Sequence, residues 1–66
     1  MNPSAEAFQK YVGLTESEAV QAIKKDGLRP RVVSRDGEHY VITMDYRTDR
    51  VNLTITEGKV TSAHVG

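Results

Sequence analysis

The absence of cysteine is the feature that most constrains how this chain of 66 residues can fold. A chain of this length buries only about 60% of the surface that it exposes when unfolded, so its stability is expected to be modest. Small domains often add disulfides or a metal ion to such a core. Without cysteine, rigidity must come from packing and hydrogen bonds, and the redox compartment cannot be inferred. We predict a flexible N-terminal arm over residues 1–10 and one small domain over residues 11–66, with no deep active site.

The charge balance and the aromatic content argue against nucleic-acid and membrane partners. Nine basic and nine acidic residues give a formal net charge of zero, so the positive surface of a nucleic-acid binder is missing at the level of the whole chain. One Phe and three Tyr are too few for a base-stacking surface. No apolar run has the length of a membrane span. The first six residues lack the basic and apolar blocks of a signal peptide, which leaves the compartment open between the cytoplasm and secretion after processing.

The clearest local pattern predicts a helix over residues 16–26. Thr15 and Glu18 have the spacing of a capping box, in which each side chain satisfies a free backbone N–H group of the other residue. Acidic residues stand near the start and lysines near the end, which matches the helix dipole. Gly27 follows as the residue best able to end the helix in a left-handed conformation.

Beta-branched and alternating patterns predict three strands, at residues 28–33, 51–56 and 59–65. In the second strand Val51, Leu53 and Ile55 are expected to point inward, and the residues between them outward. The connection between the first two strands has about the minimum length for a parallel crossover. We therefore predict an α+β fold, with one helix packed on a small mixed sheet and a long exposed loop between two parallel strands.

The predicted loop, residues 36–49, is the candidate functional segment. It has no helical pattern, and its charged residues cannot form a core. Loops of this length without regular structure are usually functional or disordered. Met44 taken alone is better suited to a core, because methionine commonly fills gaps between packed side chains. Its polar neighbours Thr43 and Asp45 favour exposure instead.

One stretch, TMDYRTDRVNLTI at residues 43–55, carries a specific pattern. Its order Thr-Met-Asp-Tyr-Arg-x-Asp-Arg-Val resembles the reactive-site loop and the following strand of the potato inhibitor I family of serine protease inhibitors. That family includes the barley chymotrypsin inhibitor and eglin. The segment VGLTESEA, residues 12–19, is similar to the start of the family's helix, and the final His-Val-Gly is similar to its usual ending. The resemblance extends from about residue 11 to residue 66.

The resemblance implies reversible, substrate-like inhibition of subtilisin- or chymotrypsin-type serine proteases, without enzymatic activity and without a cofactor. The peptide bond between Met44 and Asp45 would be the reactive-site bond, and Met44 would fill the primary specificity pocket of the protease. The other loop residues implied to contact the protease are Val41, Ile42, Thr43, Tyr46 and Arg47. One chain is enough for this activity, so we expect a monomer.

The resemblance also implies how a loop without disulfides stays rigid. In the family, two arginines from the strand beneath the loop hydrogen-bond to groups beside the scissile bond. Arg50 matches the first of them, and Thr43 and Asp45 match the groups that accept these bonds. Asn52 stands where the second arginine is expected, which predicts a less rigid loop and stronger inhibition for the substitution Asn52→Arg.

Two alternatives remain at this point. The same fold could serve as a non-inhibitory interaction module whose loop binds another protein, for example by strand addition. The basic residues between 24 and 35 could instead form a weak nucleic-acid patch. His39 and His64 lie far apart in the sequence and no cysteine joins them, so we interpret them as surface residues and predict neither a metal site nor a hydrolase site.

Overall fold

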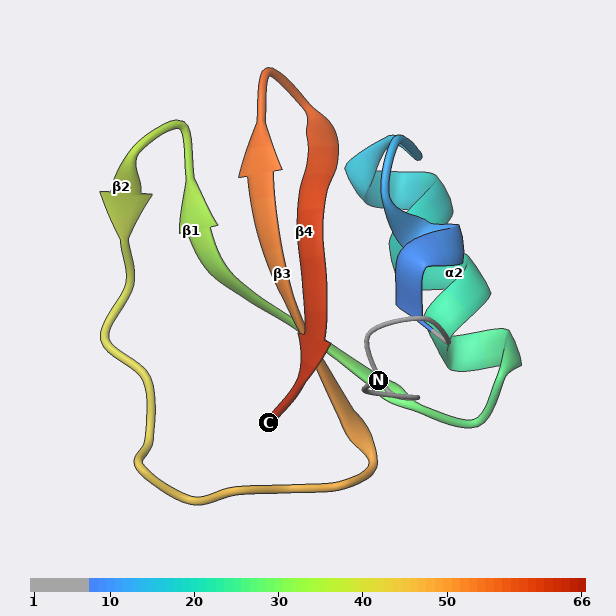
Figure 1. Cartoon of the computed structure of the whole chain (residues 1–66), viewed down its shortest axis with the longest axis vertical. Helices are drawn as coiled ribbons and strands as arrows, with labels where there is room; N and C mark the ends of the chain where they lie inside the picture. Colours follow the sequence, from blue (N-terminus) through green and yellow to red (C-terminus); the bar gives the residue numbers. More distant parts are fainter. Residues whose placement is uncertain (1–7) are drawn as a thin grey trace.

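One helix packs on a four-stranded mixed sheet (Figure 1). The computed structural model describes residues 8–66. Its elements, in chain order, are η1 (Gln9–Tyr11), α2 (Glu16–Lys25), β1 (Arg29–Arg35), β2 (Glu38–His39), β3 (Arg50–Thr56) and β4 (Lys59–Val65). The strand order is β2-β1-β3-β4, with β1 parallel to β3 and the outer pairs antiparallel. The predicted α+β class and the parallel pairing are confirmed.

The helix α2 begins and ends close to the predicted positions. The Thr15 hydroxyl accepts a hydrogen bond from the Glu18 backbone N–H at 3.2 Å, and the Glu18 carboxylate accepts one from the Thr15 backbone N–H at 3.1 Å. These bonds from Thr15 lower the pKa of Glu18. Gly27 follows with a φ of 79°, in the left-handed region that favours glycine. The predicted capping box and helix end are therefore present. Neither helix among the described residues is long and apolar enough to cross a membrane.

The sheet contains one strand that the sequence patterns missed. We predicted a first strand that ends at residue 33 and a loop that begins at residue 36. The strand β1 continues to Arg35, and only Asp36 and Gly37 form the turn, both with positive φ, at 52° and 82°. Two such residues make the tight hairpin connection that Asp-Gly favours, and it places β2 antiparallel to β1. The irregular segment therefore covers residues 40–49 and not 36–49.

The core lies between α2, η1 and one face of β3 and β4. The buried apolar residues are Phe8, Tyr11, Ala19, Ile23, Val51, Leu53, Ile55 and Val60. The three inward positions predicted for β3 are thus confirmed. Most of the predicted arm, residues 1–10, lies outside the described residues, and Phe8 at its end belongs to the core.

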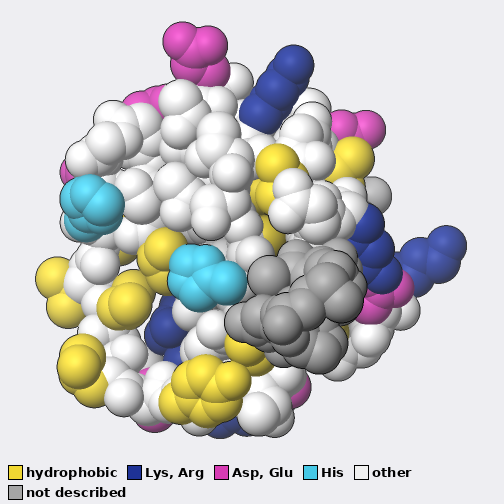
Figure 2. Space-filling model, in the orientation of Figure 1, with side chains coloured by type: hydrophobic (Ala, Val, Ile, Leu, Met, Phe, Trp, Pro, Cys, Tyr) yellow, Lys and Arg dark blue, Asp and Glu magenta, His cyan; other side chains and the backbone are white. Residues whose placement is uncertain are grey.

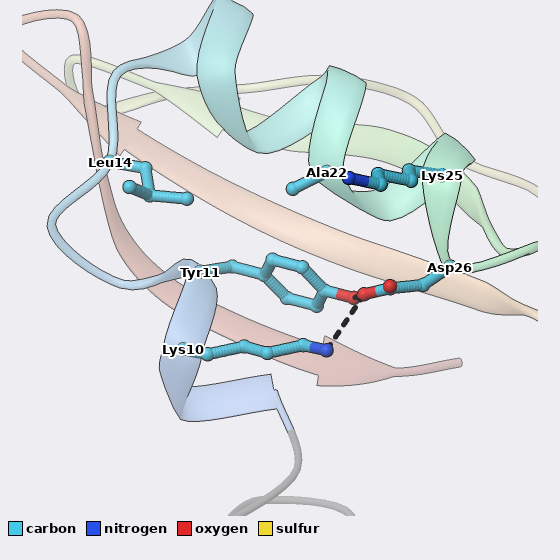
Figure 3. Close-up of a pocket in the computed structure, with 6 residues that line it drawn as sticks. All are labelled: Lys10, Tyr11, Leu14, Ala22, Lys25 and Asp26. Carbon is cyan, nitrogen blue, oxygen red and sulfur yellow. Dashed lines mark hydrogen bonds and ion pairs between the residues drawn. The ribbon is translucent and has the colours of Figure 1, made fainter.

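A small open cavity of about 240 Å³ lies between η1 and the end of α2 (Figure 3). Its lining residues are Lys10, Tyr11, Leu14, Ala22, Lys25 and Asp26. The Tyr11 hydroxyl donates a hydrogen bond to the Asp26 carboxylate, which also lies 2.8 Å from the Lys10 ammonium group. Burial, followed by the contact with Asp26, raises the pKa of Tyr11 to about 12. The hydrogen bonds from Lys10 and Tyr11 lower the pKa of Asp26. The contacts among Lys10, Tyr11 and Asp26 therefore link η1 to the C-terminal end of α2.

The lowered pKa of Asp26 predicts a loss of stability in acid. Because the folded state binds this proton more weakly than the unfolded state, the ionised carboxylate stabilises the fold above its unfolded pKa, near 4. That contribution disappears as the pH falls through the lower folded pKa. Asp26→Asn should therefore reduce the free energy of unfolding at pH 7 and flatten its decline below pH 4, as measured by urea unfolding across that range. Glu38→Gln, at an exposed carboxylate, is the control. An unchanged acid slope in Asp26→Asn would contradict the prediction.

Candidate functional site in the 40–49 loop

The loop 40–49 carries the exposed apolar side chains of the described chain. The large apolar residues that are exposed within residues 8–66 are Tyr40, Val41, Ile42, Met44 and Tyr46. Figure 2 shows apolar side chains gathered at the lower left, where the loop runs in Figure 1. Met44 is 98% exposed, which rules out the alternative that it fills the core. Exposed apolar groups gathered in one segment are typical of an interaction surface.

Strand β1 anchors both ends of this loop through its backbone. The Tyr40 N–H donates to the Val33 carbonyl oxygen at 3.1 Å, and the Arg29 N–H donates to the Asp49 carbonyl oxygen at 2.8 Å. Between these points the loop passes the end of the sheet at which β3 begins and β4 ends (Figure 1). The segment has no regular secondary structure there, so its conformation depends on side-chain contacts.

Arg50, the first residue of β3, contacts the loop on the C-terminal side of Met44. Its Nη2 donates to the Asp45 carbonyl oxygen at 2.8 Å, and its Nη1 lies 3.6 Å from the Asp45 carboxylate. Its Nε donates to the Gly66 carbonyl oxygen at 2.8 Å, while the Gly66 N–H donates to the Arg50 carbonyl oxygen. The side chain is only 12% exposed. A charged group with this many partners at low exposure is held far more firmly than one in an exposed ion pair.

The contact on the N-terminal side of Met44 comes from an arginine that no sequence pattern indicated, Arg31. Thr43 was expected to be contacted by Arg50, but its hydroxyl accepts a hydrogen bond from Arg31 Nη1 at 3.2 Å. Arg31 lies on β1, where its register partner in the parallel pair is Asn52. The two arginines thus come from neighbouring strands and end on opposite sides of Met44.

The prediction for Asn52 also requires correction. We expected an outward-pointing side chain that would act on the loop as a weaker donor. Asn52 is 6% exposed, and its Oδ1 accepts a hydrogen bond from Arg31 Nε at 2.9 Å. The outer face of β3 is covered at this position by Arg31 and by Gly66, where an added Cβ would collide with the Asn52 amide. Asn52 therefore acts as an acceptor for a second arginine and not as a donor in place of one.

Hydrogen bonds, with a smaller contribution from nearby positive charges, lower the pKa of Asp45. The Thr43 side chain contributes most, ahead of the positive charges of Arg50 and Arg31, to a lowered pKa of Asp45. Asp45 is a half-exposed carboxylate that directly follows Met44. The charged form of the Asp45 carboxylate is thus favoured, and it is attracted to Arg50 and Arg31.

The remaining loop residues divide into free and paired side chains. Val41 and Tyr46 are exposed apolar groups that point away from the domain's core. Arg47 is paired within the loop, since its Nε lies 3.1 Å from the Asp49 carboxylate, which raises the pKa of Arg47 and lowers that of Asp49. At the start of the loop, the Tyr40 hydroxyl accepts a hydrogen bond from Arg35.

Arg35 connects the start of the loop to the helix. Its Nε and Nη2 contact the two oxygens of the Glu16 carboxylate at 3.1 and 2.6 Å, in a bidentate pair. The hydrogen bonds to Glu16 and Tyr40 raise the pKa of Arg35. The group joins α2, β1 and the loop. Within residues 8–66 no three His, Asp or Glu side chains lie close enough together to hold a metal ion.

Comparisons with known proteins add no assignment. No model of a known protein family matches this chain, and no curated protein matches it. The geometry of the 40–49 loop and the residue pattern within it are therefore the features from which a function can be inferred.

Proposed function

We propose that this protein is a reversible, substrate-like inhibitor of subtilisin- or chymotrypsin-type serine proteases, of the potato inhibitor I type, with Met44–Asp45 as its reactive-site bond. One observation carries the proposal. Met44 is almost fully exposed, while the residues on both sides of it are contacted by arginines from the sheet. An exposed apolar side chain on a loop that is held at both neighbouring residues is an arrangement that a protease cleft can bind without distorting the inhibitor.

The chemistry of such inhibition requires a loop that binds well and is cleaved unproductively. A preorganised loop loses little conformational entropy on binding, which favours affinity. If the protease serine attacks the Met44 carbonyl carbon, the new amine of Asp45 must stay close to the acyl group. The Arg50 contact with the Asp45 carbonyl oxygen supports this step, because it keeps the leaving segment next to the sheet. A high effective concentration of the amine lets religation compete with hydrolysis.

Met44 determines the expected class of protease. An unbranched apolar side chain adapts to the hydrophobic specificity pockets of chymotrypsin- and subtilisin-type enzymes. It has no charge for the carboxylate at the base of a trypsin pocket. We therefore expect inhibition of the first two enzymes and little inhibition of trypsin.

Titration of the purified protein against subtilisin, chymotrypsin and trypsin tests the proposal. We expect stoichiometric loss of subtilisin or chymotrypsin activity, with the inhibitor recovered mostly intact and any slow cleavage confined to the bond after Met44. Rapid cleavage of the loop with no lasting loss of protease activity would refute it. The absence of any interaction with all three proteases would favour the non-inhibitory interaction module instead.

A further inference from the structure

The arginine contacts on the two sides of Met44 differ in how far the arginine side chain is buried. Arg50 reaches Asp45 directly, from a side chain that is itself almost buried. Arg31 is only partly buried, and its bond to the Thr43 hydroxyl is exposed. An arginine side chain that is free to rotate loses rotamer entropy when it is fixed in one position. The Arg31 contact therefore needs a second group that orients the guanidinium.

Asn52 is placed to provide that orientation. Its Oδ1 accepts a hydrogen bond from Arg31 Nε at 2.9 Å, which fixes the plane of the guanidinium and directs Nη1 toward Thr43. Asn52 in turn has little freedom, because it is buried and lies against Gly66. A continuous series of contacts thus runs from Gly66 through Asn52 and Arg31 to Thr43.

Position 52 requires a side chain that can accept the hydrogen bond from Arg31 Nε. A guanidinium has five donors and no acceptor, so an arginine at position 52 could not accept the Arg31 bond. It would also add a third positive charge beside Arg31 and Arg50 with no new carboxylate to pair with it. Asn52→Arg is therefore expected to weaken the loop, which reverses the expectation drawn from the sequence.

We propose that Arg31 and Asn52 are positioning residues that fix the N-terminal side of the Met44–Asp45 bond, and that Asn52 acts through its carbonyl oxygen. Arg31 contacts the loop, and Asn52 acts through Arg31. The consequence for inhibition rests on the proposed function, whereas the consequence for the order of the loop does not. The second positioning contact is supplied by β1 and not by β3, the strand from which Arg50 reaches the loop.

Two pairs of variants test the positioning role. Arg31→Met removes the guanidinium and keeps an unbranched side chain, and Arg29→Met is its control, two residues away on the same strand. Asn52→Leu removes the acceptor while keeping the number and branching of the side-chain heavy atoms, and Asn52→Asp keeps an oxygen at the same position. Backbone order parameters of Thr43 and Met44 from NMR relaxation, measured without any protease, report the order of the loop directly.

We expect backbone order parameters near 0.85 for these two residues in the wild type and in the variants Arg29→Met and Asn52→Asp. In Arg31→Met and Asn52→Leu the values should fall toward about 0.6. With subtilisin in excess, cleavage after Met44 should be on the order of tenfold faster in Arg31→Met and Asn52→Leu than in the wild type, because each variant loses one charge-assisted hydrogen bond. The free energy of unfolding of Arg31→Met, measured in urea, should stay close to that of the wild type, because the Arg31 side chain lies outside the core. A loss of loop order in this variant would then not result from global unfolding.

Equal order parameters in Arg31→Met and Arg29→Met would overturn the role of Arg31. Equal loss of order in Asn52→Asp and Asn52→Leu would overturn the role of the carbonyl oxygen. If the wild type inhibits no protease but the order parameters change as expected, the proposed function fails while the positioning role stands. If the wild type inhibits and the variants do not differ from it, the positioning role fails alone.

Discussion

Replacing Met44 by lysine is expected to abolish inhibition of chymotrypsin and to create inhibition of trypsin. The exposed side chain makes no contact that the fold requires, so the free energy of unfolding should stay within about 0.5 kcal/mol of the wild type. The loss against chymotrypsin should be a hundredfold or more, roughly the effect of removing the central residue of an interface. A lysine ammonium group would instead match the carboxylate of the trypsin pocket. Inhibition constants against both enzymes measure this change.

The control for Met44→Lys is Met44→Leu, a substitution of similar volume and polarity. It should keep inhibition of chymotrypsin within about tenfold of the wild type, as volume-conserving apolar exchanges usually do. If Met44→Lys inhibited chymotrypsin as well as Met44→Leu does, Met44 would not occupy the specificity pocket. The bond at which the loop contacts the protease would then have to lie elsewhere.

Removal of the Arg50 side chain is expected to turn the inhibitor into a substrate. Arg50→Ala loses hydrogen bonds to two carbonyl oxygens and the ion pair with Asp45, at a position that is nearly buried. A hydrogen bond to a charged group contributes about 1.5–3 kcal/mol, and only the one to Asp45 acts directly on the loop, so cleavage after Met44 should accelerate by up to roughly a hundredfold. The time course of cleavage by excess subtilisin, together with the recovery of protease activity, measures the effect.

Arg29→Ala is the matched control for Arg50→Ala. Arg29 is the register partner of Arg50 across the parallel pair, and its side chain is 69% exposed, 3.5 Å from Asp49. Exposed ion pairs of this kind contribute less than about 1 kcal/mol, so its loss should change the cleavage rate only a few fold. Equal cleavage rates in the two variants would show that Arg50 does not act on the loop.

The features that the sequence predicted are those encoded by neighbouring residues. Thr15 and Glu18 are three residues apart, so their capping box depends on nothing distant. The alternation of Val51, Leu53 and Ile55 reports directly which face of β3 is buried. The length of the connection was enough to predict parallel pairing, because an antiparallel pair would not need a crossover.

The features that the sequence did not predict depend on the register between two strands or on burial by residues that are distant in the sequence. Whether Arg29 or Arg31 lies beside Asn52 follows from the register of β1 on β3, and no short pattern fixes that register. The burial of Asn52 requires that Gly66 lies over it, fourteen positions away in the sequence. The hairpin at Asp36 and Gly37 was different, since that dipeptide is itself a strong turn signal and could have been read.

The anchoring of both loop ends on β1 has a consequence for how such a protein can vary. The ends of the 40–49 loop are fixed by backbone bonds, and Thr43 and Asp45 are fixed between them, so inserting or deleting one residue would move one of these groups away from its arginine. Substitutions at Val41, Met44 and Tyr46 meet no such restriction. Among relatives, the length of this segment should be constant while its exposed side chains vary. New targets would then be acquired by substitutions on an unchanged loop backbone.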